Sequence, residues 1–386
     1  MSWYNETTYL CGMSALKSIS KMLFIIYIMM TSQTAFSALE GDSLRSLKLL
    51  GGALSNVQTQ PDSALYYSDE VLKIQGVTGS NVNHINALTL KGIVYKNKGF
   101  YDLASDAYVK ALNKAINSND YARVSVCLNN IGVIYKTQKN YEQALFYFQK
   151  SLEIEKNLDN ELQLSIRHYN LGEVYLEMDS LSLAELYFTN SLIIEEQNEN
   201  LEGIIYGNYG LGLIETKRNN FKAAHNRLEF AKNELKSLDS ELGFNILNAI
   251  GSLHLKESNI DAAINCLEIV NKSPNKNEFT TIWMESAHNL AKAYAKKGNF
   301  QKAYKYATIH DSLNIVLSKS ISNQKIEELS YLYDLEQKQR KIDLLEFNQR
   351  KIEVKEKLNK DIIVFIISSI LFVIGAVIIR IRQVKS

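Results

Sequence analysis

The chain has 386 residues, of which 46% are hydrophobic and only two are proline, and its formal net charge is +1. This length suits two or three ordinary domains or one elongated repeat protein, and scarce proline favours a nearly all-helical fold because proline interrupts helices. The balanced charge excludes a globally basic protein, so no nucleic-acid partner is expected. The three cysteines form no CxxC motif, and Cys127 and Cys266 are interpreted as small buried apolar residues.

The N-terminal segment 1–37 has the pattern of a secretory signal peptide. Lysines precede a short apolar core at residues 23–30, and Ala35-Phe36-Ser37 is a small-x-small cleavage pattern. That apolar core is too short to cross a bilayer. We therefore predict cleavage after Ser37 and export of the rest of the chain, with Met1 or Met13 as the start residue. The alternative is a buried N-terminal helix.

A repeat of about 40 residues follows the signal segment. One glycine column sets its register, and an alanine follows each member of that column after twelve residues. The glycine column is Gly52, Gly92, Gly132, Gly172, Gly212 and Gly251, with Ala291 in the seventh place. The alanine column is Ala64, Ala104, Ala144, Ala184, Ala224, Ala263 and Ala303. Polar turns rich in Asn and Gly, such as Asn97-Lys98-Gly99, divide each unit into two apolar helices. We predict seven antiparallel hairpins whose helices cross most closely at the glycine and alanine.

Two aromatic columns complete the pattern. A tyrosine column stands three residues after the glycine column, and a second column of aromatic and other apolar residues stands sixteen after it; both are expected to fill the gap between neighbouring hairpins. The first is Tyr95, Tyr135, Tyr175 and Tyr294, and the second begins Tyr108, Phe148, Phe188. This set resembles the tetratricopeptide repeat over residues 41–312, with a period of 40 in place of the usual ~34. The resemblance implies an all-α, right-handed solenoid in which the hairpins stack and the degenerate first unit is a cap.

The C-terminal part is expected to be helical and to end in the membrane. Residues 313–360 predict one long charged helix, with weak heptad character that makes 324–360 a candidate homodimer contact; a solvated connecting helix is the alternative. Residues 361–381 are apolar over 18 uncharged positions, enough for a single transmembrane helix. Residues 382–386 would form a short cytoplasmic tail.

The sequence carries no catalytic signature. It has no HExxH, GxSxG, P-loop or GxGxxG motif, and no two histidines have a spacing typical of a metal site. We therefore expect no enzyme activity, no cofactor and no metal. A protein or peptide ligand is expected instead, because the resemblance implies a concave groove lined by the first helix of each hairpin. The predicted groove residues are Thr89, Asn129, Tyr169, Tyr209, Asn248, His288, Val133, Glu173, Leu213 and Lys292. Alternatively, Tyr169 and Tyr209 only pack on each other.

The whole layout resembles the extracytoplasmic sensory part of bacterial membrane-bound tetratricopeptide regulators, without their output domain. It implies a single-pass inner-membrane protein that binds a protein or peptide in the periplasm as part of signal transduction. A scaffold for envelope assembly or secretion, a truncated relative of a transcriptional regulator or histidine kinase, and a tail-anchored cytosolic adaptor are the alternatives.

Overall fold

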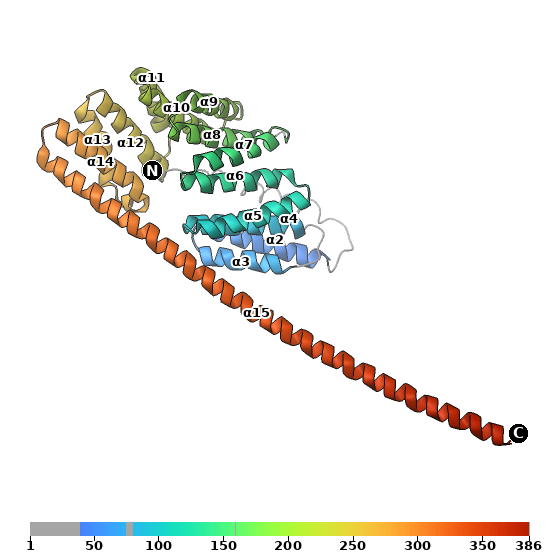
Figure 1. The fold of residues 1–386 in the computed structure, drawn as a ribbon. Helices are drawn as coiled ribbons and strands as arrows, with labels where there is room; N and C mark the ends of the chain where they lie inside the picture. Colours follow the sequence, from blue (N-terminus) through green and yellow to red (C-terminus); the bar gives the residue numbers. More distant parts are fainter. Residues whose placement is uncertain (1–38, 75–79, 159, 386) are drawn as a thin grey trace. The chain divides into compact units, whose positions relative to one another are not determined.

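The computed structural model describes residues 39–74, 80–158 and 160–385 (Figure 1). Within these ranges all regular structure is helical, so the predicted all-α class is confirmed. The signal segment 1–37 lies outside the described residues. Contacts divide the chain into two compact units, Met1–Lys325 and Ile326–Ser386, which are considered separately.

The first unit is a series of helical hairpins, as the repeat predicted. The helices run α2 (Leu39–Asn56), α3 (Pro61–Lys73), α4 (Ser80–Asn97), α5 (Tyr101–Asn117), α6 (Tyr121–Thr137), α7 (Tyr141–Glu155), α8 (Glu161–Glu177), α9 (Leu181–Gln197), α10 (Leu201–Lys217), α11 (Phe221–Glu234), α12 (Glu241–Lys256), α13 (Ile260–Lys272), η1 (Pro274–Phe279), α14 (Thr280–Lys296) and α15 (Phe300–Lys385). Even-numbered helices from α2 to α14 are the first helices of their hairpins. From α4 to α12, each packs on the second helix that follows it and on the second helix of the hairpin before.

In six of the seven hairpins, from the second to the seventh, the turn contains one residue with a left-handed backbone. These residues are Gly99, Lys139, Asp179, Asn219, Ser258 and Gly298, with φ between 56° and 79°. Only glycine adopts this conformation without strain, and asparagine tolerates it better than other residues. Lys139 adopts the same backbone conformation at the repeat position where two other hairpins carry glycine. The position in the repeat, rather than the residue type, therefore decides where the turn lies.

The glycine column lies where the two helices of a hairpin approach most closely. A Cβ added to Gly172 would lie 2.7 Å from Cδ1 of Phe188, and one on Gly132 would meet Phe148 at the same distance. These aromatics belong to the column sixteen residues after the glycine. The predicted close crossing is thus confirmed. The aromatic ring leaves no room for a residue larger than glycine at this position.

The tyrosine column makes contacts that the sequence pattern did not predict. Tyr175 stacks on Tyr187 of its own hairpin, with ring centroids 5.4 Å apart and planes 10° from parallel. Tyr135 stacks on Tyr147 in the same way within the preceding hairpin. Tyr175 also packs against the cluster around Phe148 of that preceding hairpin. The expectation that this column only fills gaps between hairpins was therefore incomplete.

Helix α15 has no backbone break from Phe300 to Lys385. It includes the second helix of the seventh hairpin, the charged segment 313–360 and the apolar segment 361–381. The sequence between Gly298 and Gly375 contains neither glycine nor proline, so nothing in it terminates the helix. Of residues 361–381, only Ile362 has a described side chain, and the predicted span therefore falls outside the described side chains. Within the described part of the chain, no helix combines the length and apolarity needed to cross a bilayer.

Candidate ligand-binding face

The first helices α6, α8, α10 and α12 carry polar side chains that contact one another from hairpin to hairpin. Asn170 of α8 donates from Nδ2 to Oδ1 of Asn129 on α6 at 2.7 Å. The Lys136 ammonium forms an ion pair with the Glu173 carboxylate across the same pair of helices. We call the polar residues of these first helices the polar face. Three of its members, Asn129, Asn170 and Glu173, hold neighbouring hairpins together.

Glu173 is the most perturbed acid of the polar face. Only 1% of its side chain is exposed. Burial raises the pKa of this carboxyl to about 7, and the nearby Lys136 charge opposes part of that rise. A carboxyl with such a pKa changes protonation near neutral pH.

Several buried acceptors of the polar face have no hydrogen-bond partner among the described residues. They are Oδ1 of Asn170, Asn245 and Asn248. An unsatisfied buried acceptor costs about 1–3 kcal/mol, so each of these atoms gains when a ligand or water supplies a donor. The N–H groups of an extended peptide are donors of this kind, but the acceptors are buried, so a peptide would reach them only if the side chains turned outward.

The predicted groove residues fall into two groups in the structure. Seven are no more than 8% exposed, namely Thr89, Asn129, Val133, Tyr169, Glu173, Tyr209 and Asn248. Leu213 is half-buried, and His288 and Lys292 are exposed. The last three are therefore the groove residues that a ligand can reach without rearrangement. The groove assignment itself stays a prediction.

The two groove tyrosines belong to separate apolar clusters. The Tyr169 ring lies 5.2 Å from that of Phe188 and 5.7 Å from that of Tyr206 on the next first helix. Tyr209 instead packs with Leu228 and Ile250. Both rings thus contribute to packing between hairpins, and truncating either would also destabilise the stack.

A lysine at the end of three first helices reaches the preceding first helix. Each ammonium donates to a main-chain carbonyl in the last turn of that neighbour, where carbonyls lack helical partners and the helix dipole favours positive charge. The pairs are Lys217 to Leu176 O at 3.5 Å, Lys256 to Thr216 O at 2.8 Å, and Lys296 to Leu255 O at 3.2 Å. The sequence analysis missed this lysine column, although its spacing of 39 and 40 residues follows the repeat.

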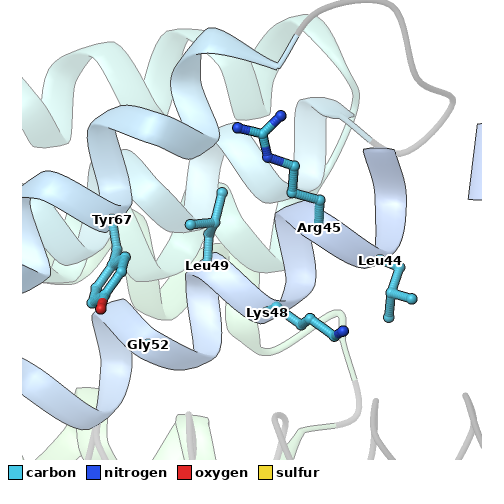
Figure 2. A pocket seen from close by; sticks show the side chains of 6 residues that line it. All are labelled: Leu44, Arg45, Lys48, Leu49, Gly52 and Tyr67. Atoms are coloured by element: carbon cyan, nitrogen blue, oxygen red, sulfur yellow. The ribbon is translucent and has the colours of Figure 1, made fainter. Parts of the chain in front are cut away.

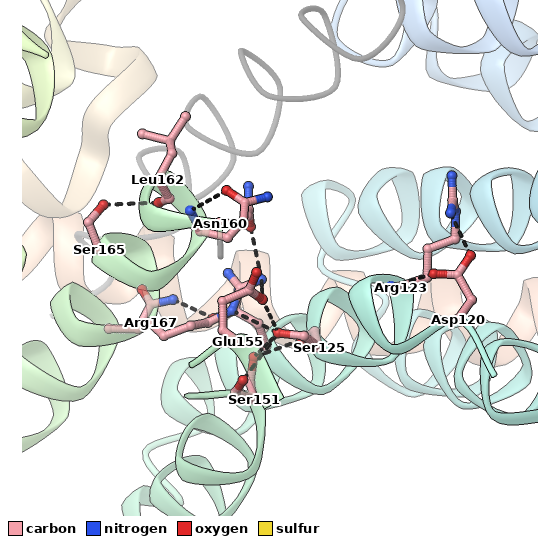
Figure 3. Close-up of polar contacts among 12 residues, drawn as sticks. Asp120, Arg123, Ser125, Ser151, Glu155, Asn160, Leu162, Ser165 and Arg167 are labelled. Atoms are coloured by element: carbon pink, nitrogen blue, oxygen red, sulfur yellow. Dashed lines mark hydrogen bonds and ion pairs between the residues drawn. The ribbon is translucent and has the colours of Figure 1, made fainter. Parts of the chain in front are cut away.

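Behind the polar face, a buried network joins α6, α7 and α8 (Figure 3). The Ser125 hydroxyl donates to Oε2 of Glu155 at 2.5 Å and lies 2.9 Å from the hydroxyl of Ser151. Arg167 of α8 approaches the same Glu155 oxygen at 3.6 Å. The guanidinium also donates to Gln163 at 2.9 Å, so the buried charges have hydrogen-bonding partners.

A shallow pocket of about 460 Å³ lies on the first hairpin (Figure 2). Arg45 and Lys48 of α2 and Tyr67 of α3 line it, together with Leu44, Leu49 and Gly52. Two cationic side chains beside an aromatic ring would suit an anionic group. The pocket lies on the degenerate hairpin, away from the polar face.

Comparison with protein families decides what the hairpins are. Residues 83–157, which span α4 to α7, match the model of the tetratricopeptide repeat. Residues 83–157 are tetratricopeptide repeats. No curated protein matches the chain. The resemblance read from the glycine, alanine and aromatic columns is therefore confirmed.

Solved structures share the tetratricopeptide architecture at low sequence identity. The apo form of RapI is 17% identical with a TM-score of 0.57, over 71% of this chain and 99% of that one. Aspartyl phosphate phosphatase F from Bacillus subtilis is 14% identical with a TM-score of 0.56, over 72% of each chain. The Rap conjugation gene regulator of plasmid pLS20, solved with the Phr* peptide, is 14% identical with a TM-score of 0.55, over 75% of this chain and 79% of that one. At these identities the likeness establishes the fold alone.

Proposed function

We propose that this chain is a membrane-anchored protein-interaction module whose tetratricopeptide repeats bind a protein or peptide in the periplasm as part of signal transduction. One observation carries the binding part of this proposal. The unpaired amide oxygens of Asn170, Asn245 and Asn248 lie on the first helices, and a polypeptide backbone would supply the missing N–H donors once these buried side chains turn toward it. Amide side chains contribute hydrogen bonds of this kind in many recognition surfaces.

The reachable groove residues define where binding would begin. Leu213 offers apolar contact, and His288 and Lys292 present polar groups one hairpin beyond Asn248. A solved neighbour of the same fold holds the Phr* peptide. That likeness in fold alone favours a peptide over a folded domain as the ligand.

The proposed location depends on the two ends of the sequence. A signal peptide ending at Ser37 would export the repeats, and residues 361–381 would anchor them in the bacterial inner membrane with 382–386 inside. Leu345 and Ile352, which fall on the predicted heptad seam of 324–360, are exposed, as a dimer contact requires.

A catalytic role is not part of the proposal. One solved neighbour is a phosphatase by name, but its 14% identity carries no activity to this chain. The alternatives are a scaffold for envelope assembly or secretion and a cytosolic adaptor. Each differs from the leading proposal in partner or in topology.

Site-specific photo-crosslinking in cells tests the binding face. A photoreactive residue at Leu213, His288 or Lys292 should capture a ligand. The same residue at Phe146 or Leu186, both 52% exposed on second helices, provides the matched control. Crosslinks confined to the control positions would refute the assigned face, and exclusive capture of secretion machinery would favour the scaffold.

Protease accessibility tests the location separately. The repeats in intact spheroplasts should be digested by added protease, because the proposal places them outside the inner membrane. Protection until the inner membrane is broken would sink the periplasmic assignment and favour the cytosolic adaptor.

A further inference from the structure

Two histidines and a glutamate meet at the junction between α11 and α12. Nε2 of His225 lies 2.8 Å from Oε2 of Glu257, and Nδ1 of His254 lies 3.3 Å from the same oxygen. One ligand atom of each residue lies within 4.8 Å of the other two. The imidazole centroids are 5.0 Å apart. Three side chains of the types that bind divalent metals therefore converge on one point.

The donor set and spacing fit a tetrahedral metal ion. Bonds of 2.0–2.2 Å from Zn²⁺ to nitrogen and oxygen place neighbouring donors about 3.3 Å apart in a tetrahedron. The His254–Glu257 separation of 3.3 Å already has this value. The His225–Glu257 separation of 2.8 Å would lengthen by about half an ångström, and the two imidazole nitrogens, which lie within 4.8 Å of each other, would take the same spacing. The His225 side chain is 30% exposed, so it has room to move. Two imidazoles and one carboxylate leave a fourth position for water, and such donors suit Zn²⁺ better than Ca²⁺ or Mg²⁺.

The surroundings do not oppose a cation at this point. His254 and Glu257 are 16% and 23% exposed, so an ion can enter from solvent. The nearby Lys256 ammonium is engaged elsewhere, because it donates to the carbonyl of Thr216. His254 also breaks the repeat, since it occupies the register of the tyrosine column in the sixth hairpin.

We propose that His225, His254 and Glu257 form a Zn²⁺ site that cross-links two consecutive hairpins. His225 lies on the second helix of the fifth hairpin, and His254 and Glu257 end the first helix of the sixth. The bound ion would fix the angle between these hairpins where residues 235–240 connect them without a regular helix. This site is independent of the proposed ligand-binding face.

Calorimetry with the full-length chain in mild detergent, stripped of metal with a chelator and titrated with Zn²⁺ alone, tests the proposal. The wild type should bind one equivalent and melt at a higher temperature with Zn²⁺ than with chelator. His225→Ala, His254→Ala or Glu257→Gln should each lower the affinity by roughly 100-fold or more, since even outer partners of ligands contribute 10–100-fold. Co²⁺ should give the visible absorption of tetrahedral coordination in the wild type and lose it in His254→Ala.

The chain supplies a matched control in its other histidine pair. His288 and His310 have ring centroids 5.1 Å apart, and His310 lies 3.1 Å from the carboxylate of Asp311. His310→Ala should therefore keep wild-type Zn²⁺ affinity and the metal-dependent melting temperature. Stoichiometric binding that survives all three ligand substitutions, or no binding by the wild type, would overturn the assignment. Circular dichroism of each variant without metal checks that the helices remain folded.

Discussion

Arg167 and Glu155 form an ion pair between adjacent hairpins in which each side chain is only 2% exposed. Forty residues earlier in the repeat, Cys127 and Ala115 occupy the equivalent positions and pack in one apolar cluster. Two equivalent junctions of the repeat are therefore built differently, one with a pair of charged residues and one with small apolar residues. Stacking itself does not require the ion pair.

Removing one charge of this pair should be costlier than removing both. Arg167→Met leaves the Glu155 carboxylate buried beside Ser125, and we expect a loss of about 3 kcal/mol or more in the free energy of unfolding. The double change Arg167→Met/Glu155→Ala should lose less than the sum of the single changes. Urea denaturation of the four proteins in a double-mutant cycle measures the coupling. Strict additivity would contradict the pairing.

Gly172→Ala should destabilise the stack by about 1–3 kcal/mol, because the new methyl group would overlap the Phe188 ring. Gly51 offers the matched control, since a Cβ there meets nothing within 4 Å. Gly51→Ala should be neutral or stabilise α2 by up to about 1 kcal/mol through helix propensity. Thermal melts of both variants check the contrast, and equal effects would show that helix crossing does not depend on the glycine column.

Lys139→Gly should stabilise the protein by about 0.5–1 kcal/mol. Lys139 has φ of 60°, and this conformation costs a residue with a Cβ about 1–2 kcal/mol. Glycine avoids that cost, but part of the gain is lost because glycine makes the unfolded chain more flexible. Lys110→Gly, at an exposed site inside α5, should lose about 1 kcal/mol instead. Denaturant midpoints of the two variants should move in opposite directions; a shared direction would contradict the strain argument.

Acid should weaken the fold through His168. Burial lowers the pKa of this imidazole from 6.5 to about 4, with a smaller contribution from Lys156. The unfolded chain therefore binds a proton between pH 6.5 and 4 that the folded chain does not, and stability falls as the pH drops through this window. The full loss is about 3 kcal/mol for this group.

His168→Phe should reduce that acid loss. The ring centroid of His168 lies 5.7 Å from that of Tyr187, so phenylalanine can keep this aromatic contact. Stability at pH 8, where the imidazole is neutral in both states, reports the packing change alone. The difference in the free energy of unfolding between pH 8 and pH 4 then reports the protonation of the imidazole. If the variant loses as much stability on acidification as the wild type does, other groups cause the acid loss.

The repeat could be predicted because its determinants are local and periodic. Gly172 and Phe188 stand sixteen residues apart within one hairpin, and the same spacing recurs in other hairpins, so the columns indicate their contact. The burial of Tyr169 and Tyr209 could not be predicted in the same way, since it depends on how far each hairpin rotates against the next. The metal candidates were missed for a related reason, because His225 and His254 are 29 residues apart and meet only across a hairpin junction.

The sequence by itself determined the helical hairpins, their register and their turn positions, because helix periodicity, small residues at the crossings and turn-forming residues act within each 40-residue unit. The tertiary structure decided which polar side chains meet between units: Arg167 with Glu155, Lys136 with Glu173, and His225 with His254 and Glu257. Those meetings depend on the spacing and rotation of whole hairpins. A pattern that repeats along the chain does not encode these quantities, because each junction sets them by its own packing.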